Sequence, residues 1–149
     1  MKAGLVVIGA LALSGCASLG GPSPTSRPDV VAQVNVLRQS AGLPPVRVAA
    51  LSVTRDRASS AWPHRNGDLA AGHKGFSGDV IAADMPGAWA GENLYRGPSR
   101  SSGQEVVETW SASMRHKAIM LHRGAQVCSA ASVADERLAV VALTCGGEP

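Results

Sequence analysis

Hydrophobic positions at helical spacing begin directly after residue 28 of the chain. Over residues 29–39, apolar side chains recur every three or four positions, as expected for a helix with one buried face. These positions are Val30, Val34 and Leu37. Asp29 is suited to cap the start of this helix, and Gly42 is a residue type that commonly follows a helix end. We therefore predict a first helix over residues 29–39.

Two further stretches have helical patterns. Residues 48–62 are rich in Ala and Ser and end before a proline, which predicts a second helix. Ser102 and Glu105 form a capping-box pattern that opens a third helix running to about Met114. The apolar positions of this third helix are Val106, Val107, Trp110 and Met114. Trp110 is therefore expected to lie in the core.

The segment between the second and third helices has no such pattern. Residues 66–90 are rich in glycine, so we expect loops there with a helical turn around residues 79–83. A short turn is also expected over residues 116–121, after the third helix.

An apolar run also opens the chain. Lys2 precedes residues 5–13, a run as long as the core of a signal peptide and too short to span a bilayer. The sequence Leu-Ser-Gly follows and ends at Cys16, and small residues before a cysteine resemble the lipobox of bacterial lipoproteins. We predict a lipoprotein signal peptide over residues 1–15 and acylation of Cys16; an ordinary signal peptide is the alternative.

The residues that follow this cysteine predict a membrane-tethered domain. Residues 16–28 comprise the acylated cysteine and a tether rich in Pro, Gly and Ser, and the folded domain is expected over residues 29–149. Ala17 favours the outer membrane by the general sorting tendency of bacteria. We therefore expect a membrane partner through the lipid anchor, with the domain facing the periplasm.

The end of the chain has the pattern of a β-hairpin. Two short runs with β-branched residues, 126–133 and 138–145, flank a polar stretch. A turn at the centre of that stretch places Cys128 directly opposite Cys145. Cysteines in an oxidising compartment form disulfides by default, although free catalytic or metal-binding cysteines are the alternative. Because helices come first and strands last, the pattern predicts an α+β layered domain.

Composition and charge limit the possible binding partners but do not indicate a reaction. The chain has 149 residues, which is typical of one domain, and 45% of them are hydrophobic while 3% are aromatic. A formal net charge of +3 is too weak and too evenly spread to predict nucleic-acid binding. The sequence also lacks the common catalytic motifs for serine hydrolases, zinc proteases and nucleotide binding.

Several small motifs in register carry a resemblance to a known family. The chain contains N-x-x-R from Asn35, followed by Gly-Leu-Pro from Gly42. Gly-Glu-Asn-Leu begins at Gly91, W-x-x-S at Trp110 and H-K-x-I-x-L at His116. In this order they resemble the CAP superfamily of cysteine-rich secretory, antigen-five and pathogenesis-related proteins. The resemblance implies an α-β-α sandwich with helices on both faces of an antiparallel sheet.

The resemblance also implies a site. In the family, two histidines and two glutamates meet in a central cleft and can hold a divalent metal; His73, Glu92 and His116 match three of them. Ser113 stands where animal and plant relatives have the fourth, a glutamate, and a hydroxyl is a poor ligand and a poor general base. Glu108 is placed too far round the predicted helix to substitute. We expect zinc or magnesium, if a metal binds, to be held by His73 and His116.

Other residues near these motifs have less defined roles. Trp89 either lines the cleft or simply packs in the core, and Asn93 is expected to fix the turn of the Gly-Glu-Asn motif by side-chain hydrogen bonds to the backbone. His64 and His122 are expected to face solvent.

Three functions remain open at this stage. We expect a lipid-anchored binding module for a hydrophobic or cell-envelope ligand, because some members of the family bind lipids. A metal-assisted envelope hydrolase is the first alternative, and a structural or interaction protein of the envelope is the second. An enzyme is the less favoured interpretation, and fold alone does not decide among the three.

Overall fold

The structure is a computed structural model that describes residues 21–82, 85, 87 and 89–148. The predicted signal peptide over residues 1–15, the acylation site Cys16 and the first part of the tether lie outside the described residues. Within the described part of the chain, no helix combines the length and apolar character needed to cross a membrane.

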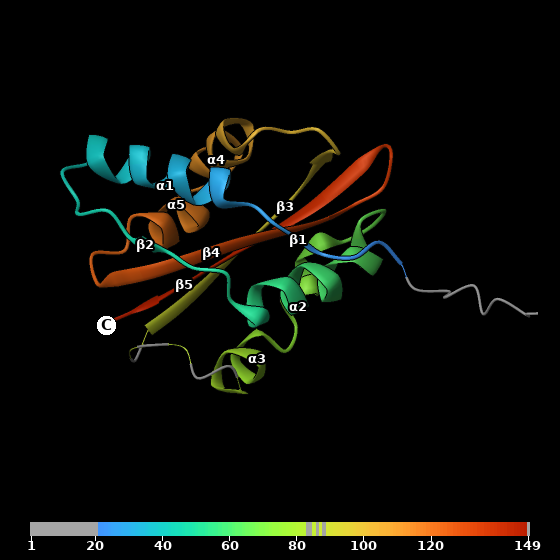
Figure 1. The fold of residues 1–149 in the computed structure, drawn as a ribbon, viewed down its shortest axis with the longest axis horizontal. Coiled ribbons are helices and arrows are strands. Elements are labelled where there is room, and N and C mark those ends of the chain that lie inside the picture. Colours follow the sequence, from blue (N-terminus) through green and yellow to red (C-terminus); the bar gives the residue numbers. More distant parts are fainter. Residues whose placement is uncertain (1–20, 83–84, 86, 88, 149) are drawn as a thin grey trace, which may run out of the picture.

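A five-stranded sheet forms the middle layer of the domain (Figure 1). Its strands are β1 (Thr25–Ser26), β2 (Arg47–Val48), β3 (Trp89–Pro98), β4 (Ala125–Ala134) and β5 (Leu138–Gly147). The strand order is β1-β4-β5-β3, and all these neighbours are antiparallel. The short strand β2 pairs with β4 in the parallel direction. β3, from the middle of the sequence, therefore lies at one edge of the sheet.

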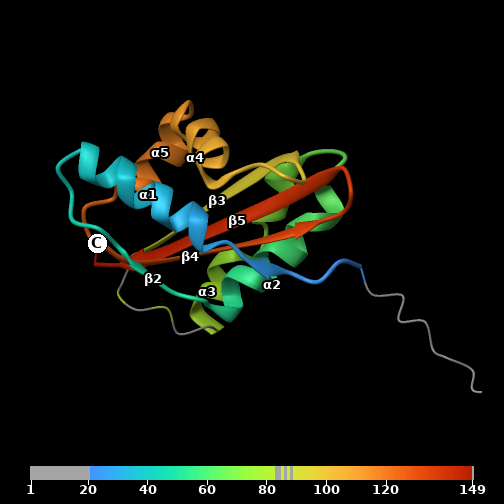
Figure 2. The same cartoon turned by 45° about the horizontal axis from the view of Figure 1, so that its top comes forward.

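Helices cover both faces of this sheet. They are α1 (Pro28–Ser40), α2 (Ser52–Ala61), α3 (Phe76–Ala82), α4 (Gly103–Ser111) and α5 (Met114–Met120), with the short 3₁₀ helices η1 (Trp62–His64) and η2 (Leu69–His73). Figure 2 shows α1, α4 and α5 on one side of the sheet and α2 and α3 on the other. The predicted α+β class and the layered arrangement of helices, sheet and helices are confirmed.

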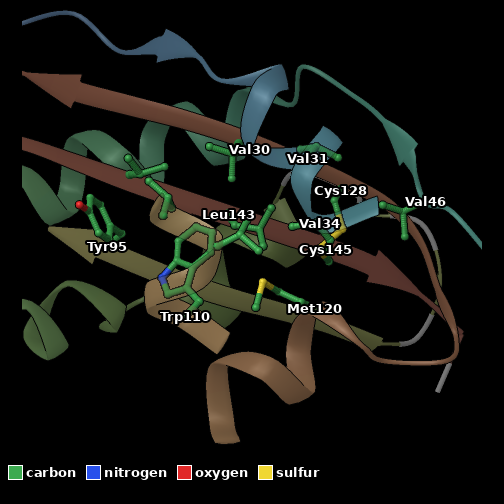
Figure 3. Packing of buried hydrophobic residues seen from close by; sticks show 14 of the residues in the cluster. Val30, Val31, Val34, Val46, Tyr95, Trp110, Met120, Cys128, Leu143 and Cys145 are labelled. Atoms are coloured by element: carbon green, nitrogen blue, oxygen red, sulfur yellow. A yellow bond between two sulfur atoms is a disulfide. The ribbon is translucent and has the colours of Figure 1, made fainter. Parts of the chain in front are cut away.

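The alternating side chains of the strands divide the core into two layers. On β5, Val141 and Leu143 face α1 and α4, whereas Val140 and Ala142 face α2. Figure 3 shows the larger layer, in which Trp110 is packed among aliphatic side chains. Trp110 is 1% exposed, and its indole Nε1 donates to the carbonyl oxygen of Leu94 at 2.9 Å. Its predicted place in the core is confirmed.

The C-terminal hairpin has the register that the sequence predicted. Cys128 pairs with Cys145 across β4 and β5, and their sulfurs form a disulfide. The carboxylate of Asp135 forms the turn by accepting from the backbone N–H groups of Arg137 and Leu138. An irregularity near the start of β4, between Ala125 and Val127, is the single register shift in this pairing.

The first helix is placed as predicted, but its start differs. Arg27 occupies the N-cap position and makes no side-chain cap; Pro28 is the first helical residue, and Asp29 lies in the first turn. Proline suits this position because its fixed φ is already helical and its missing N–H is not needed there. The prediction that Asp29 caps the helix was wrong, and its carboxylate instead binds Arg27. Gly42 follows the helix end with φ +69°, as expected.

The second helix begins four residues later than predicted. Arg47 and Val48 are extended and pair with Val127 and Cys128 of β4, so the helix starts only at Ser52. Val48 is β-branched, which suits a strand, but its pairing with the distant Cys128 could not be predicted from the local pattern.

A ten-residue strand was missed by the sequence analysis. β3 contains Gly91, Glu92 and Asn93, which have low β propensity, and Trp89 was expected in a loop. Pairing with β5 along its whole length holds this segment extended. The Gly-Glu-Asn motif therefore lies on a strand and not in a turn.

The third predicted helix is two helices. The chain leaves helical geometry at Ser113, which has φ −106° and ψ 123°, so α4 ends before it and α5 begins after it. Met114 therefore lies at the start of α5, where it is 89% exposed and not on the apolar face. Most of residues 116–121 are helical, where a short turn was expected.

Two motif residues near the N-terminus fix the neighbouring segments. The side chain of Asn35 donates to and accepts from the backbone of Val46 at 3.0 and 2.8 Å. Arg38 is fully buried, and its guanidinium donates to the carbonyl oxygens of Pro44, Met120 and His122, each at 2.9 Å. Burial lowers the pKa of Arg38. This contact ties α1 to the C-terminal end of α5, the helix that carries His116.

Candidate functional site

Glu92 lies at the centre of the candidate site. It belongs to β3 and points to the α2 side of the sheet, where it is directly opposite Thr144 of β5, which in turn is opposite Ser129 of β4. Three polar side chains thus cross the sheet beneath α2. Thr54 of α2 shares a buried hydrogen bond with Thr144, with 2.5 Å between the hydroxyl oxygens. The carboxylate of Glu92 therefore lies next to other polar side chains within a layer that is otherwise apolar.

A buried arginine neutralises this carboxylate. The Nε of Arg57 donates to Oε2 of Glu92 at 2.7 Å, and both side chains are 1% exposed. The guanidinium also bonds to the carboxylate of Asp79 on α3, at 2.5 Å, and to the carbonyl oxygen of Gly72. Burial alone would lower the pKa of Arg57, but the bonds to Glu92 and Asp79 raise it above the usual value. Arg57 is therefore a permanent cation at the base of the site.

Glu92 also orients His73. The second carboxylate oxygen, Oε1, lies 2.7 Å from Nδ1 of His73, at the end of η2. A carboxylate paired with arginine can only accept, so Nδ1 carries the proton and Nε2 is the free nitrogen of the neutral ring. The side chain of His73 is 38% exposed, so this ring is accessible to a ligand.

His116 approaches from the other side of the sheet. It lies on α5, where its backbone carbonyl accepts from the side-chain amide of Asn93 at 3.0 Å. Burial lowers the pKa of His116, and protonation of His73 would lower it further. The His116 ring is therefore neutral at neutral pH. The two histidines thus belong to elements on opposite faces of the sheet, and both elements contact the edge strand β3.

Asn93 makes a side-chain hydrogen bond to the backbone, as predicted, but not to the segment that was predicted. Its side chain does bind a backbone group, but this group belongs to α5 and not to a turn of its own motif. It faces the opposite side of the sheet from Glu92, because neighbouring residues of a strand alternate. Asn93 therefore connects the strand that carries Glu92 to the helix that carries His116.

Trp89 and Ser113 lie at the starts of the elements that carry Glu92 and His116, β3 and α5. The ring of Trp89 stacks on His122, with centroids 3.8 Å apart and planes 4° from parallel, and it packs partly against the core. His64 and His122 were both expected to face solvent, and both are instead partly buried. Ser113 is the N-cap residue of α5 and makes no side-chain cap. The expectation that Glu108 and Ser113 lie on one helix was wrong, since α4 ends at Ser111.

The sequence analysis missed Arg57 and Asp79. Arg57 belongs to the buried face of α2, together with Val53, Thr54, Ala58 and Ala61. A charged residue among such positions requires a buried partner, because an isolated ion inside a protein is very costly. This pattern is visible in the sequence once the helix is placed, and it could have signalled a carboxylate on the facing strand.

The donor set constrains how a metal could bind. Both oxygens of Glu92 are already bound, one by Arg57 and one by His73. Among the described residues, no group of three or more His, Cys, Asp or Glu side chains is arranged to hold a metal ion. With both oxygens engaged, Glu92 is not available as a direct ligand, so the imidazoles of His73 and His116 are the remaining donors of the predicted site.

Comparison with known proteins identifies the fold. No protein-family model matches the sequence, and a search of characterised proteins gave no match. Several solved structures do match, among them a cysteine-rich secretory protein from Staphylococcus aureus, an outer surface protein from Borrelia burgdorferi and an extracellular protein with an SCP domain from Bacillus anthracis. The chain thus has the fold of bacterial CAP, or SCP-like, domain proteins.

These matches share structure and little sequence. The TM-scores are 0.54, 0.60 and 0.53, and the identities are 13%, 12% and 15%, in the same order. The matches cover 77%, 80% and 78% of this chain. They span 90% of the Borrelia protein but only 37% and 39% of the Staphylococcus and Bacillus chains. The fold expected from the resemblance is confirmed, and the disulfide indicates a compartment outside the cytoplasm.

Proposed function

We propose that this protein is a lipid-anchored, extracytoplasmic binding module whose envelope ligand contacts the imidazoles of His73 and His116. The observation that carries this proposal is the bonding of Glu92. Its carboxylate is held by Arg57 and in turn holds His73 in one tautomer, with the second ring nitrogen free for a ligand. Such a carboxylate positions another group and is not itself free to react.

The same bonding disfavours the hydrolase hypothesis. A general base must be free to take a proton from the attacking water. The side chain of Glu92 is 1% exposed, and each of its oxygens already accepts a hydrogen bond. Ser113, at the position of the family's second glutamate, offers a hydroxyl that is a weak base. We therefore favour binding over turnover.

A metal would take its place between the histidines in this proposal. His73 would bind it through Nε2 and His116 through its neutral ring, while Glu92 would fix the orientation of His73. Neutral imidazoles suit zinc better than magnesium, which prefers oxygen ligands. Bound zinc would supply an electrophilic contact for a carbonyl or anionic oxygen of the ligand.

Anchorage completes the proposed function. Acylation of Cys16 would hold the domain at the outer membrane, facing the periplasm, where the disulfide is stable. The three matched bacterial proteins are described as secretory, outer surface and extracellular, which supports an extracytoplasmic place for this chain.

Calorimetric titration of the fragment Ala17–Pro149 with zinc, magnesium and calcium tests the site. We expect saturable zinc binding that is lost in both His73→Ala and His116→Ala. His64→Ala is the matched control, because His64 lies on η1, outside the site, and should leave zinc binding unchanged. Lipid that co-purifies with the same fragment after incubation with an envelope extract should be analysed in parallel.

Two results would count against this proposal. Absence of both zinc binding and a co-purified envelope ligand, together with a lower melting temperature of His73→Ala, would indicate a structural cluster. Turnover of an ester or peptide that is lost in Glu92→Ala while the fold survives would instead indicate a hydrolase.

A further inference from the structure

Two neighbouring grooves lie at the end of the domain where the tether joins it, and the proposed ligand site uses neither. The first has a volume of about 390 Å³ and is lined by residues 21–24 of the tether together with Trp62, Pro63 and Val133. The rings and the valine make its walls largely apolar. The tether itself forms one side of this groove.

The second groove is polar and carries charges of both signs. It has a volume of about 560 Å³, and its charged lining residues are Arg65, Asp135 and Arg137. Nε of Arg65 lies 4.0 Å from a carboxylate oxygen of Asp135, and both side chains are partly exposed. Two guanidinium groups and one carboxylate therefore face the same space.

A stacked pair joins the two grooves. The guanidinium of Arg65 lies over the ring of Trp62, 4.2 Å from its centroid, and donates to the Trp62 carbonyl oxygen at 3.1 Å. Arg96 fixes this segment by donating to the carbonyl oxygens of Arg65 and Gly67. The result is a fixed surface with an aromatic ring on one side and an arginine on the other. Tryptophan and arginine together are favoured at the boundary between lipid and water.

The length of the tether limits how far this surface can be from a membrane. Gly21, which lines the first groove, lies five positions after Cys16 in the chain. An extended chain spans at most about 3.6 Å per residue, so this distance is no more than about 18 Å. A weak surface held this close to lipid has a high effective concentration and binds far better than it would free in solution.

We propose that this surface, which we call the tether face (Trp62, Pro63, Arg65, Asp135 and Arg137), docks on the phospholipid headgroups of the anchoring membrane. Trp62 and Pro63 lie at the level where headgroups meet acyl chains. The arginines bind the lipid phosphate, and Asp135 binds the ammonium of a zwitterionic headgroup such as phosphoethanolamine. The proposal rests on the anchorage at Cys16 that is part of the proposed function, and it adds the orientation of the domain.

Trp89 provides a matched control for Trp62. Both rings are partly exposed, but they lie at opposite ends of the sheet. Trp89 pairs with Gly147, whereas Val133, beside Trp62, pairs with Val140. These partners lie seven positions apart along β5, or about 23 Å at 3.3 Å per residue. Lipid that touches Trp62 therefore does not reach Trp89.

Fluorescence quenching by brominated lipids tests the proposal. Full-length acylated protein is reconstituted in vesicles of phosphatidylethanolamine and phosphatidylglycerol that contain lipids brominated near the headgroup. We expect quenching of tryptophan emission that falls at least about twofold in Trp62→Phe and is retained in Trp89→Phe, since interfacial contact belongs to one ring. Arg137→Glu, whose side chain is exposed, should reduce the quenching without disturbing Trp62. The Arg137→Glu variant therefore still tests the proposal if Trp62→Phe does not fold.

The mass of the N-terminal peptide from the same sample separates the possible failures. Acylated Cys16 with equal quenching in wild type and Trp62→Phe would overturn the docking and leave the anchor intact. A Cys16 without acyl chains would overturn the docking together with the anchor, while zinc titration would still report on His73 and His116. Shielding of Trp62 from both lipid and aqueous acrylamide would show that protein covers the tether face, and would also overturn the proposal.

Discussion

Replacing Glu92 by glutamine keeps the size of the side chain but removes the charge that faces Arg57. The two side chains are each 1% exposed, and their closest atoms are 2.7 Å apart. Asp79 bonds to another part of the same guanidinium, but its side chain is 42% exposed. Arg57 would therefore lose its buried counter-charge in this variant and would remain an ion in the core.

The structure gives the size of the expected effect. Breaking a buried ion pair by removing one partner typically costs about 3–5 kcal/mol. Asp79 and the carbonyl of Gly72 still bind Arg57 in the variant, so we expect the lower end, about 3 kcal/mol. This is a large part of the roughly 5–15 kcal/mol that stabilises a typical domain.

Urea unfolding of the oxidised fragment Ala17–Pro149 at neutral pH measures this loss. Asp29→Asn is a matched control, because the Arg27–Asp29 pair has the same 2.7 Å separation but side chains that are 15% and 49% exposed. That control should lose no more than about 1 kcal/mol. A larger loss in Glu92→Gln than in Asp29→Asn would show that burial of the ion pair, and not its short distance alone, determines the loss of stability.

A double variant completes the test. The double variant Arg57→Met/Glu92→Leu replaces the buried pair by apolar side chains. Its loss of stability should be clearly smaller than the sum of the losses in Arg57→Met and Glu92→Leu measured singly. The reasoning would be refuted if Glu92→Gln cost less than about 1 kcal/mol, as an exposed pair does, or if the two single losses were simply additive.

Three further predictions concern the disulfide, His116 and a close helix contact. Replacing Cys128 and Cys145 by alanine should cost about 3 kcal/mol in the same urea assay, because the bond closes a 17-residue loop. The pKa of His116 is lowered on folding, so stability should decrease as pH falls below its unfolded value of 6.5, and urea titrations of His116→Gln should show a shallower decrease. A methyl group on Gly103 would lie 2.6 Å from a backbone oxygen of α1, so Gly103→Ala should cost about 1–3 kcal/mol, whereas Gly78→Ala, with open space around it, should not destabilise. These expectations would be contradicted if the cysteine double variant or Gly103→Ala were as stable as wild type, or if His116→Gln and wild type had equal pH slopes.

The parts of the fold that local signals encode were predicted well. The capping box of Ser102 and Glu105 is present with both reciprocal bonds. The hairpin and the pairing of Cys128 with Cys145 follow from two short runs and one polar turn. In each case the residues that determine the structure lie within about twenty positions of one another, so the sequence alone contains the information.

Elements that depend on distant partners were not predicted. β3 is extended because it pairs with β5, and its own Gly and Asn residues favour other conformations. For the same reason the sequence indicated His73, Glu92 and His116 only through a family resemblance. Arg57 has no motif of its own, and its role appears only when α2 is packed over β3.

The order of strands also has a consequence for how the chain reaches its native state. β4 and β5 are neighbours in sequence and carry the disulfide, so they can form early as an oxidised hairpin. β3 must then be added across a long loop, since Glu92 pairs with Thr144, 52 residues later. Until β3 arrives, the edge of β5 is an open template for the strand of another chain. Conditions that delay this last pairing should therefore favour aggregation, and the same step brings Glu92 to its partners.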